Sequence, residues 1–165
     1  MKKRLIDVHA HLQDSDFSKD FPDVIERSKN SDIAGIINVG SDLPSSRKAV
    51  QLAESESFLW AVVGVHPHDA KTWNSSTELE LEELLKNPKV LGIGETGLDY
   101  HYDLSPRPQQ MLVFESQWKL ASKLSIPIVV HVRDAFDDFF KIISGKPPPP
   151  KVLLHCFSGG MNEAR

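Results

Sequence analysis

The sequence has 165 residues, of which 40% are hydrophobic and 25% charged, a balance that excludes a disordered chain and is typical of one globular domain. Its formal net charge of −4 excludes a global basic field, so any contact with nucleic acid must be local or mediated by bound cations. Cys156 is the single cysteine, which excludes an intrachain disulfide, and no apolar run approaches the roughly 18 residues that a membrane helix needs. We therefore expect residues 1–165 to form a single soluble domain in the reducing cytoplasm.

Six short β-branched runs recur along the chain at intervals of about thirty residues, and a stretch with helical character follows each of them. In chain order the expected strands are Arg4–Val8, Ile33–Val39, Leu59–Val65, Lys89–Glu95, Ile126–His131 and Lys151–Cys156. The expected helices are Pro44–Glu54, Thr77–Lys86, Pro106–Leu124 and Ala135–Ile143. The proline run Pro147–Pro150 fits neither a helix nor a central strand and predicts a stiff connector into the sixth strand.

The alternation of strands and helices predicts a parallel α/β fold. Two architectures remain open at this point, a doubly wound sheet and a (β/α)8 barrel. The first strand is not followed by a glycine-rich phosphate loop but by a pair of histidines. This favours a TIM-like (β/α)8 barrel, of which the chain carries about six strand–helix units.

The histidine pair closes the first expected strand. His9 and His11 are two residues apart, so both side chains point to the same face of an extended chain. Ile6, Val8 and Ala10 then share the opposite face, which suits an apolar exterior covered by helices.

Three further metal-competent residues close later strands of the predicted sheet. Glu95 ends the fourth expected strand, His131 the fifth and His155 the sixth, in phase with residues that would face the interior. In a barrel these positions lie near the C-terminal mouth, where such enzymes carry out their chemistry. A lone histidine at a strand end is more often solvated, and Glu95 alone would serve as a helix cap. The coincidence of four strand ends favours a metal site.

Imidazoles suit zinc, while a carboxylate also suits manganese or magnesium and can bridge two ions. Two divalent ions about 3.5–4 Å apart can clamp a phosphodiester and activate water near neutral pH. The residue types therefore predict a divalent-metal site (Zn, Mn or Mg), at which a carboxylate could bridge two divalent metal ions.

Two side chains are candidates for contact with substrate. His66 follows the third strand together with His68, and either contacts a phosphate or serves as a polar loop residue. Arg133, just past the fifth strand, is well placed for a phosphate, with an ion pair to a neighbouring aspartate as the competing use.

Three other polar or reactive residues have simpler expectations. Asp99 either shapes the mouth of the barrel or forms a turn without a catalytic role. His101 has no phase argument and is expected on the surface. Cys156 is expected to be a small buried apolar group rather than a nucleophile.

Five ordered blocks of the sequence resemble the signature blocks of the TatD family. They are residues 6–12 (IDVHAHL), 64–68 (GVHPH), 92–100 (GIGETGLDY), 127–135 (PIVVHVRDA) and 155–159 (HCFSG). Together they run through essentially the whole chain, and five blocks in order are far more specific than a single His-x-His pair.

The resemblance implies a metal-binding hydrolase, a deoxyribonuclease that cleaves phosphodiester bonds of DNA as a 3′-5′ exonuclease with little sequence preference. It implies that His9 and His11 hold one metal and that His131 and His155 hold the other. Glu95 would bridge the two ions and so act in catalysis. No membrane and no obligate protein partner are expected.

The family pattern also includes a later aspartate at the end of the eighth strand, and this chain stops at Arg165. We therefore expect a barrel without its last two units, in which the first and sixth strands are open edges. Two alternatives remain. One is a barrel amidohydrolase acting on amide or lactone bonds, which usually carries a carbamylated lysine where this chain has Glu95. The other is a catalytically silent metal-binding fragment.

Overall fold

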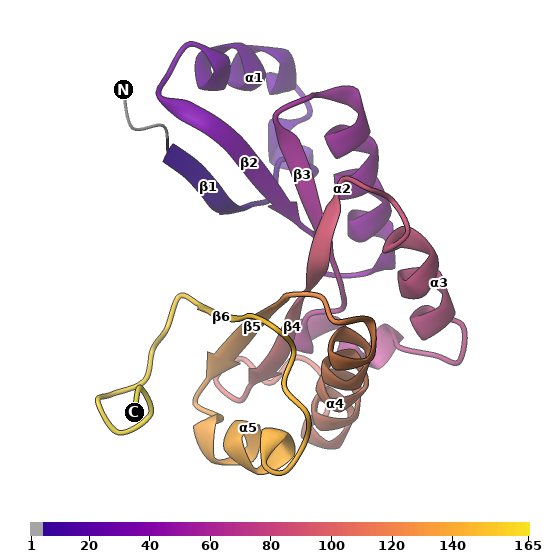
Figure 1. Cartoon of the computed structure of the whole chain (residues 1–165), viewed down its shortest axis with the longest axis vertical. Helices are drawn as coiled ribbons and strands as arrows, with labels where there is room; N and C mark the ends of the chain where they lie inside the picture. The colour runs from indigo at the N-terminus through magenta and orange to yellow at the C-terminus, as the bar shows by residue number, and fades with distance from the viewer. Residues whose placement is uncertain (1–4) are drawn as a thin grey trace.

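The computed structural model describes residues 5–165 and contains one parallel sheet whose strands are arranged in sequence order (Figure 1). The strands are β1 (Leu5–Ala10), β2 (Ile33–Val39), β3 (Leu59–Val63), β4 (Val90–Asp99), β5 (Ile128–Arg133) and β6 (Val152–His155). The sheet curls into a half-barrel, which confirms the parallel barrel-type α/β fold. Among the described residues, β1 and β6 each pair with one strand only, as expected for edges.

Helices cover the convex side of the sheet in Figure 1. They are α1 (Phe21–Lys29), α2 (Leu43–Ser55), α3 (Thr77–Leu84), α4 (Arg107–Leu124) and α5 (Phe136–Ile143), with short 3-10 turns η1 (Ser15–Phe17) and η2 (Pro67–Thr72). The four expected helices are confirmed within two residues at each end, and α1 is an addition. The proline connector carries no helix or strand, as expected. Within the described residues, no helix is long and apolar enough to cross a membrane.

The strand bounds differ from expectation where they matter most. The first expected strand began at Arg4, which lies outside the described residues. The strand β4 continues four residues beyond Glu95, and β5 continues two residues beyond His131. The expectation that these two residues close their strands was therefore wrong. The reason is that residues 96–99 of β4 go on pairing with residues 130–133 of β5.

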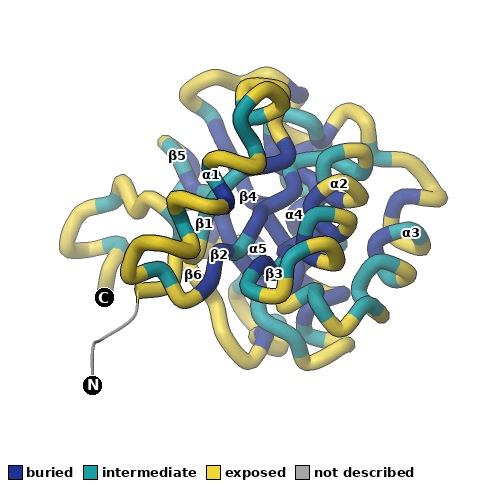
Figure 2. The backbone as a smooth tube through the Cα atoms, turned by 90° about the horizontal axis from the view of Figure 1, so that it is seen from above, coloured by how far each residue is buried: buried dark blue, intermediate teal, exposed yellow. Residues whose placement is uncertain are grey.

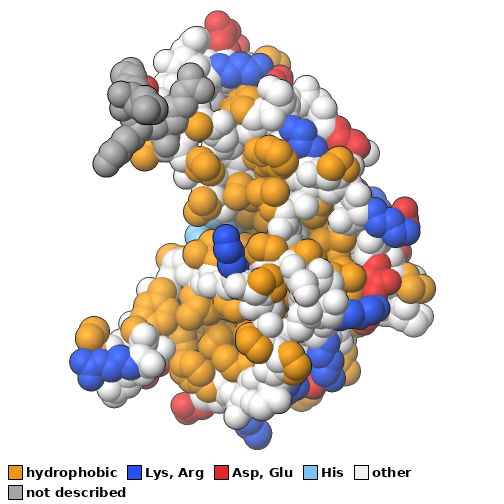
Figure 3. All heavy atoms as spheres, viewed as in Figure 1, with side chains coloured by type: hydrophobic (Ala, Val, Ile, Leu, Met, Phe, Trp, Pro, Cys, Tyr) orange, Lys and Arg blue, Asp and Glu red, His pale blue; other side chains and the backbone are white. Residues whose placement is uncertain are grey.

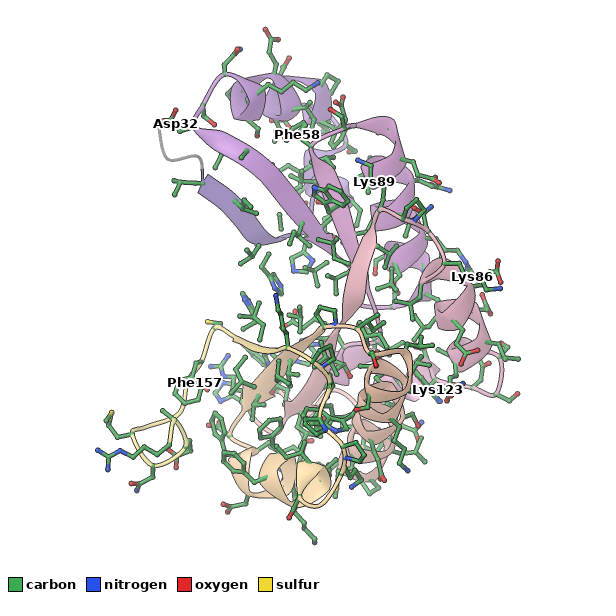
Figure 4. The ribbon with its side chains drawn as sticks, in the orientation of Figure 1. Asp32, Phe58, Lys86, Lys89, Lys123 and Phe157 are labelled. Atoms are coloured by element: carbon green, nitrogen blue, oxygen red, sulfur yellow. The ribbon has the colours of Figure 1, made fainter. Side chains whose placement is uncertain are left out.

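The helical layer is anchored at both ends of the sheet. At the start of α2, Asp42 accepts a hydrogen bond from the amide of Ser45, whose hydroxyl accepts one from the amide of Asp42, forming a capping box. At the opposite end, Lys89 donates to three carbonyl oxygens at 2.9–3.2 Å and lies over the Trp60 ring (Figure 4). Lys123 of α4 pairs with Glu82 of α3 at 2.9 Å.

The two faces of the sheet differ in how they are covered. The convex face packs against the helices in one large apolar core, and the strands are its most buried part (Figure 2). The concave face holds a smaller cluster, and a hollow of about 550 Å³ opens on it (Figure 3). The hollow is lined mainly by Val8, Ile37, Val62, Leu91, Val129 and Leu153.

Val8 was expected on the helix-covered exterior, and this was wrong. It lines the concave hollow, because the pairing of β1 with β2 is irregular between Asp7 and Ala10, which breaks simple alternation. Cys156 was also misjudged, since it is exposed. It directly follows β6 with a φ of 46°, a left-handed turn that leads the chain away from the sheet. His101 is exposed, as expected.

Candidate metal centre

Glu95 lies at the centre of the polar cluster and is almost fully buried. Its two carboxylate oxygens face different histidines. The Oε2 atom is 3.2 Å from Nε2 of His9 on β1, and the Oε1 atom is 3.3 Å from Nδ1 of His131 on β5. The pairing irregularity between Ile93 and Thr96 falls on this segment and gives Glu95 its local orientation. One carboxylate is thereby shared between strands on opposite sides of it.

His11 is oriented by the backbone of the neighbouring strand. Its Nδ1 atom lies 2.8 Å from the carbonyl oxygen of Val39, to which it must donate, so the lone pair is left on Nε2. The ring centroid is 5.0 Å from that of His9. A metal-ligating imidazole is usually fixed in this way, by donating its other N–H to a carbonyl or carboxylate.

His155 joins the cluster from β6. Its ring stacks on that of His9 with centroids 3.5 Å apart and an interplanar angle of 10°. Burial lowers the pKa of His155, and the neighbouring His9 adds to this, so the ring is held in the neutral form that can bind a metal.

Candidate ligand atoms within 4.8 Å of one another form two groups in the described part of the chain. One comprises His9, His11 and Glu95, and the other comprises Glu95, His131 and His66. Glu95 belongs to both groups. Four of the five predicted ligands fall in these groups, whereas His155 belongs to neither. His66, predicted as a substrate contact, is instead a member of the second group.

The position of His66 depends on helix α4. Gln117 accepts from the amide of Val65 and donates to its carbonyl, both at 2.9 Å, which fixes the backbone just before His66. The Nδ1 atom of His66 accepts from the amide of His68 at 3.2 Å and caps η2. Burial lowers the pKa of His66 to about 3, so the ring is neutral at ordinary pH.

Charge in the cluster is balanced by the pairing of Glu95 with histidines. Burial acts to raise the pKa of Glu95, but hydrogen bonds from His131 and His9 outweigh it, and the net pKa is well below its usual range. For His131, burial acts to lower the pKa, yet the bonds to Glu95 and Asp99 prevail and raise it. In both cases the arrangement favours a positive charge beside the Glu95 carboxylate.

Asp99 is the polar residue whose importance the sequence did not reveal. It is fully buried, and its Oδ2 atom lies 2.9 Å from Nε2 of both His68 and His131. Burial tends to raise the pKa of Asp99, but hydrogen bonds from the Tyr102 amide and the two imidazoles lower it to about 2. The available signal was spacing, since Asp99 lies four residues after Glu95 on what proves to be a continuous strand.

Arg133 forms a contact that neither expected use describes. Its guanidinium lies over the Tyr102 ring, 4.9 Å from the centroid. The competing use was an ion pair with Asp134, Asp137 or Asp138. Of these, Asp134 pairs with His101 at 3.2 Å, and Asp138 accepts from the hydroxyl of Tyr100 at 2.8 Å.

The donor set fits divalent metal ions. Imidazole nitrogens and a carboxylate are ligands of zinc and manganese, and Glu95 presents one oxygen to each side. The Nδ1 atom of His9 is buried without a hydrogen-bond partner, and such an orphaned polar atom in a cluster of donors is consistent with a missing ligand.

A curled parallel β/α sheet with a histidine–glutamate cluster towards the C-terminal ends of its strands defines the chain as a barrel-type protein with a candidate metal centre. Comparison with known proteins gives the family. The family model described as "TatD related DNase" matches residues 6–165, and the chain belongs to this family.

Two proteins to which the chain is similar have names that fit this family. The chain is 37% identical over 163 residues to the 3′-5′ ssDNA/RNA exonuclease TatD of Edwardsiella piscicida, covering 96% of this chain and 62% of that protein. It is 38% identical over 162 residues to the uncharacterized metal-dependent hydrolase YabD of Bacillus subtilis, covering 98% and 64%. The chain thus spans less than two thirds of the length of these relatives.

Solved structures show the same fold. The crystal structure of YJJV, a TatD homolog from Escherichia coli, superposes with a TM-score of 0.89 at 27% identity, covering 98% of this chain and 63% of that one. A TatD family hydrolase from Entamoeba histolytica gives a TM-score of 0.85 at 25% identity, with 99% and 61% coverage.

Proposed function

We propose that this chain carries the site of a divalent-metal-dependent hydrolase that cleaves phosphodiester bonds of DNA, acting from the 3′ end as an exonuclease. The observation that carries the proposal is the position of Glu95, whose two oxygens face His9 and His131 at 3.2 and 3.3 Å. The name of the Edwardsiella relative, an exonuclease on single-stranded DNA and RNA, supports this substrate class.

The proposed ligand assignment is the one that the family resemblance implies. His9 and His11 would hold one ion, His131 and His155 would hold the other, and Glu95 would bridge the two. When bound, divalent ions (Zn, Mn or Mg) neutralise phosphate charge and lower the pKa of water so that it can attack phosphorus. The buried Glu95 offsets the repulsion between two cations, which neutral imidazoles cannot do.

Two side chains are proposed to hold the substrate. His66 is neutral and buried, so it acts as a hydrogen-bond donor to a phosphate oxygen rather than as a cation. Arg133 supplies a positive charge at the mouth, where its stacking on Tyr102 keeps the guanidinium in place. With a net charge of −4 the chain has no overall basic field, so we expect contacts with nucleic acid to be local and directed at the phosphate, with weak sequence preference.

We further propose that residues 1–165 form a single domain and that the protein works in the cytoplasm. The strands share one apolar core along the convex face of the sheet, which supports one domain. The exposed free thiol of Cys156 suits a reducing compartment.

The metal centre is tested by elemental analysis and calorimetric titration with zinc and manganese. We expect the wild-type chain to bind about two ions, and Glu95→Gln and His131→Ala to lose at least one. His101→Ala, which removes an exposed histidine, is the matched control, and this variant should retain both ions. Equal metal content in all four proteins would contradict the ligand assignment.

The reaction is tested on 3′- and 5′-labelled single-stranded oligonucleotides of unrelated sequence, with lactone and amide substrates in parallel. The expected result is metal-dependent shortening from the 3′ end that EDTA abolishes. Cleavage that resists EDTA, or turnover of a lactone without any nuclease activity, would contradict the proposed reaction. A chain that binds metal yet cleaves none of these substrates would instead be the catalytically silent metal-binding fragment.

A further inference from the structure

The buried carboxylate of Asp99 makes hydrogen bonds through both oxygens, and the two oxygens have different partners. The Oδ1 atom accepts from the backbone amides of His101 and Tyr102 at 3.0 and 2.8 Å, which closes the turn after β4. The Oδ2 atom accepts from Nε2 of His68 and Nε2 of His131, each at 2.9 Å. A turn needs only the first pair of bonds, so the second pair has a separate explanation.

The bonds to Oδ2 determine where the imidazole protons are. An ionised carboxylate can only accept, so Nε2 of His131 must carry a proton. In the neutral ring the lone pair is then on Nδ1, which lies 3.3 Å from Oε1 of Glu95. In the metal-free protein a proton on Nδ1 can bridge this distance as an N–H···O bond to Glu95, and a divalent ion can take the place of that proton between the two atoms.

We propose that Asp99 is a positioning residue of the metal centre, which fixes the proton of His131 on Nε2 and so directs the Nδ1 lone pair to a metal ion shared with Glu95. This inference rests on the proposed metal-binding function. Neither the family match nor the names of the relatives assign a role to Asp99.

The surroundings of Asp99 are rigid enough for this role. Its backbone amide donates to Oε1 of Gln110 at 2.8 Å, and Nε2 of Gln110 donates back to its carbonyl at 3.2 Å. Gly97, two residues earlier, pairs directly with His131 across the β4–β5 register. The backbone of Asp99 is therefore held by helix α4, and its strand is paired with the strand that carries His131.

The test uses Asp99→Asn, which changes one oxygen and keeps the shape. The asparagine carbonyl can still accept from the amides of His101 and Tyr102, whereas its NH2 group cannot accept from Nε2 of His131. We expect zinc affinity to fall about 10–100-fold, with little change in the melting temperature of the metal-free protein.

The matched control is Asp134→Asn. Asp134 also pairs with a histidine, Nδ1 of His101 at 3.2 Å, but both groups are exposed and neither belongs to the cluster around Glu95. Asn tolerates the φ of 54° at this position. Zinc affinity of this variant should equal that of the wild type.

A double-mutant cycle separates positioning from general damage. In the His131→Ala background, the remaining zinc affinity should be the same with Asp or Asn at residue 99, because Asp99 acts through His131. An effect of Asp99→Asn that persists undiminished without the imidazole would overturn the proposal. Long-range 1H–15N spectra of the zinc-loaded wild type give a readout that needs no variant. A proton on Nε2 of His131 is expected, and a proton on Nδ1 would refute the inference.

These outcomes can be told apart from failure of the proposed function. A wild-type chain that binds no zinc overturns the metal centre and the role of Asp99 together. Zinc binding that is equal in wild type and Asp99→Asn overturns the role of Asp99 alone and leaves the metal centre standing.

Discussion

The side chain of Gln117 satisfies both backbone polar groups of Val65, with an N–H···O distance of 2.9 Å in each direction. The same amide donates to the hydroxyl of Thr96 at 2.6 Å, the residue after Glu95. Seven residues earlier on the same face of α4, Gln110 holds Asp99 in a similar way. Through Gln110 and Gln117, helix α4 thus holds the backbone beside His66, Glu95 and Asp99.

Replacing Gln117 by Leu should destabilise the chain, because the amide and carbonyl of Val65 would be buried without partners. The cost of an unsatisfied buried group is about 1–3 kcal/mol, and urea denaturation measures it. Gln109→Leu on the same helix is the control and should change stability by less than about 0.5 kcal/mol. If Gln117→Leu were as stable as wild type, the amide would not be needed to hold this strand end.

Replacing Gly97 by Ala should lower both stability and metal affinity. A Cβ atom there would overlap the carbonyl oxygen of His131, and the φ of 138° is strained for any other residue. We expect a loss of at least about 2 kcal/mol in thermal or urea unfolding. Gly35→Ala is the comparison, since its Cβ would make ordinary contacts. Equal stability of the two variants would show that the strands can separate freely near His131.

Replacing His66 by Ala distinguishes a substrate contact from a metal ligand. A neutral donor to phosphate is worth about 1.5–3 kcal/mol, so kcat/KM on the oligonucleotide should fall about 10–150-fold while metal content stays at the wild-type level. Elemental analysis and initial rates are measured on the same samples. Loss of one ion would instead make His66 a ligand of the second group, beside Glu95 and His131.

Stability at alkaline pH should depend on Tyr100. Burial and the hydrogen bond to Asp138 raise the pKa of its hydroxyl above the ordinary value near 10. The unfolded chain therefore loses this proton first as the pH rises, and the contribution of Tyr100 to stability, fully present below about pH 10, declines above it.

Urea denaturation of wild type and Tyr100→Phe at pH 8 and pH 10.8 measures this difference. We expect the wild type to lose more stability between the two pH values than the variant loses. Lysines titrate in both proteins and cancel in the comparison. An equal loss in both proteins would show that the Tyr100 hydroxyl does not titrate differently on folding.

The sequence predicted the six strands, their parallel arrangement and most of the residues that gather around Glu95. This succeeded best for β5 and β6, where Val129 and Leu153 line the concave face in phase with His131 and His155. Alternation by two is reliable there because the pairing of β5 with β6 is regular.

It failed where pairing is irregular. In β4, Leu91 lines the concave hollow while Ile93 belongs to the main core, although simple alternation places both on one face with Glu95. The pairing of β4 with β3 shifts between Val90 and Gly92, which breaks the alternation at Leu91, and no local sequence pattern revealed it. The role of Asp99 was hidden for a different reason, because β4 was expected to end at Glu95 and instead continues to Asp99.

The strict sequence order of the sheet has a consequence for how the polypeptide acquires its shape. Each strand pairs only with its neighbours in the sequence, so every ladder among the described residues joins segments one crossover apart. Short chain separations reduce the entropy of loop closure and favour rapid formation of contacts. During synthesis, the last finished strand is a template on which the next can dock as soon as its helix has emerged. Of the histidines around Glu95, His155 would therefore be the last to arrive, with the strand β6 that it ends.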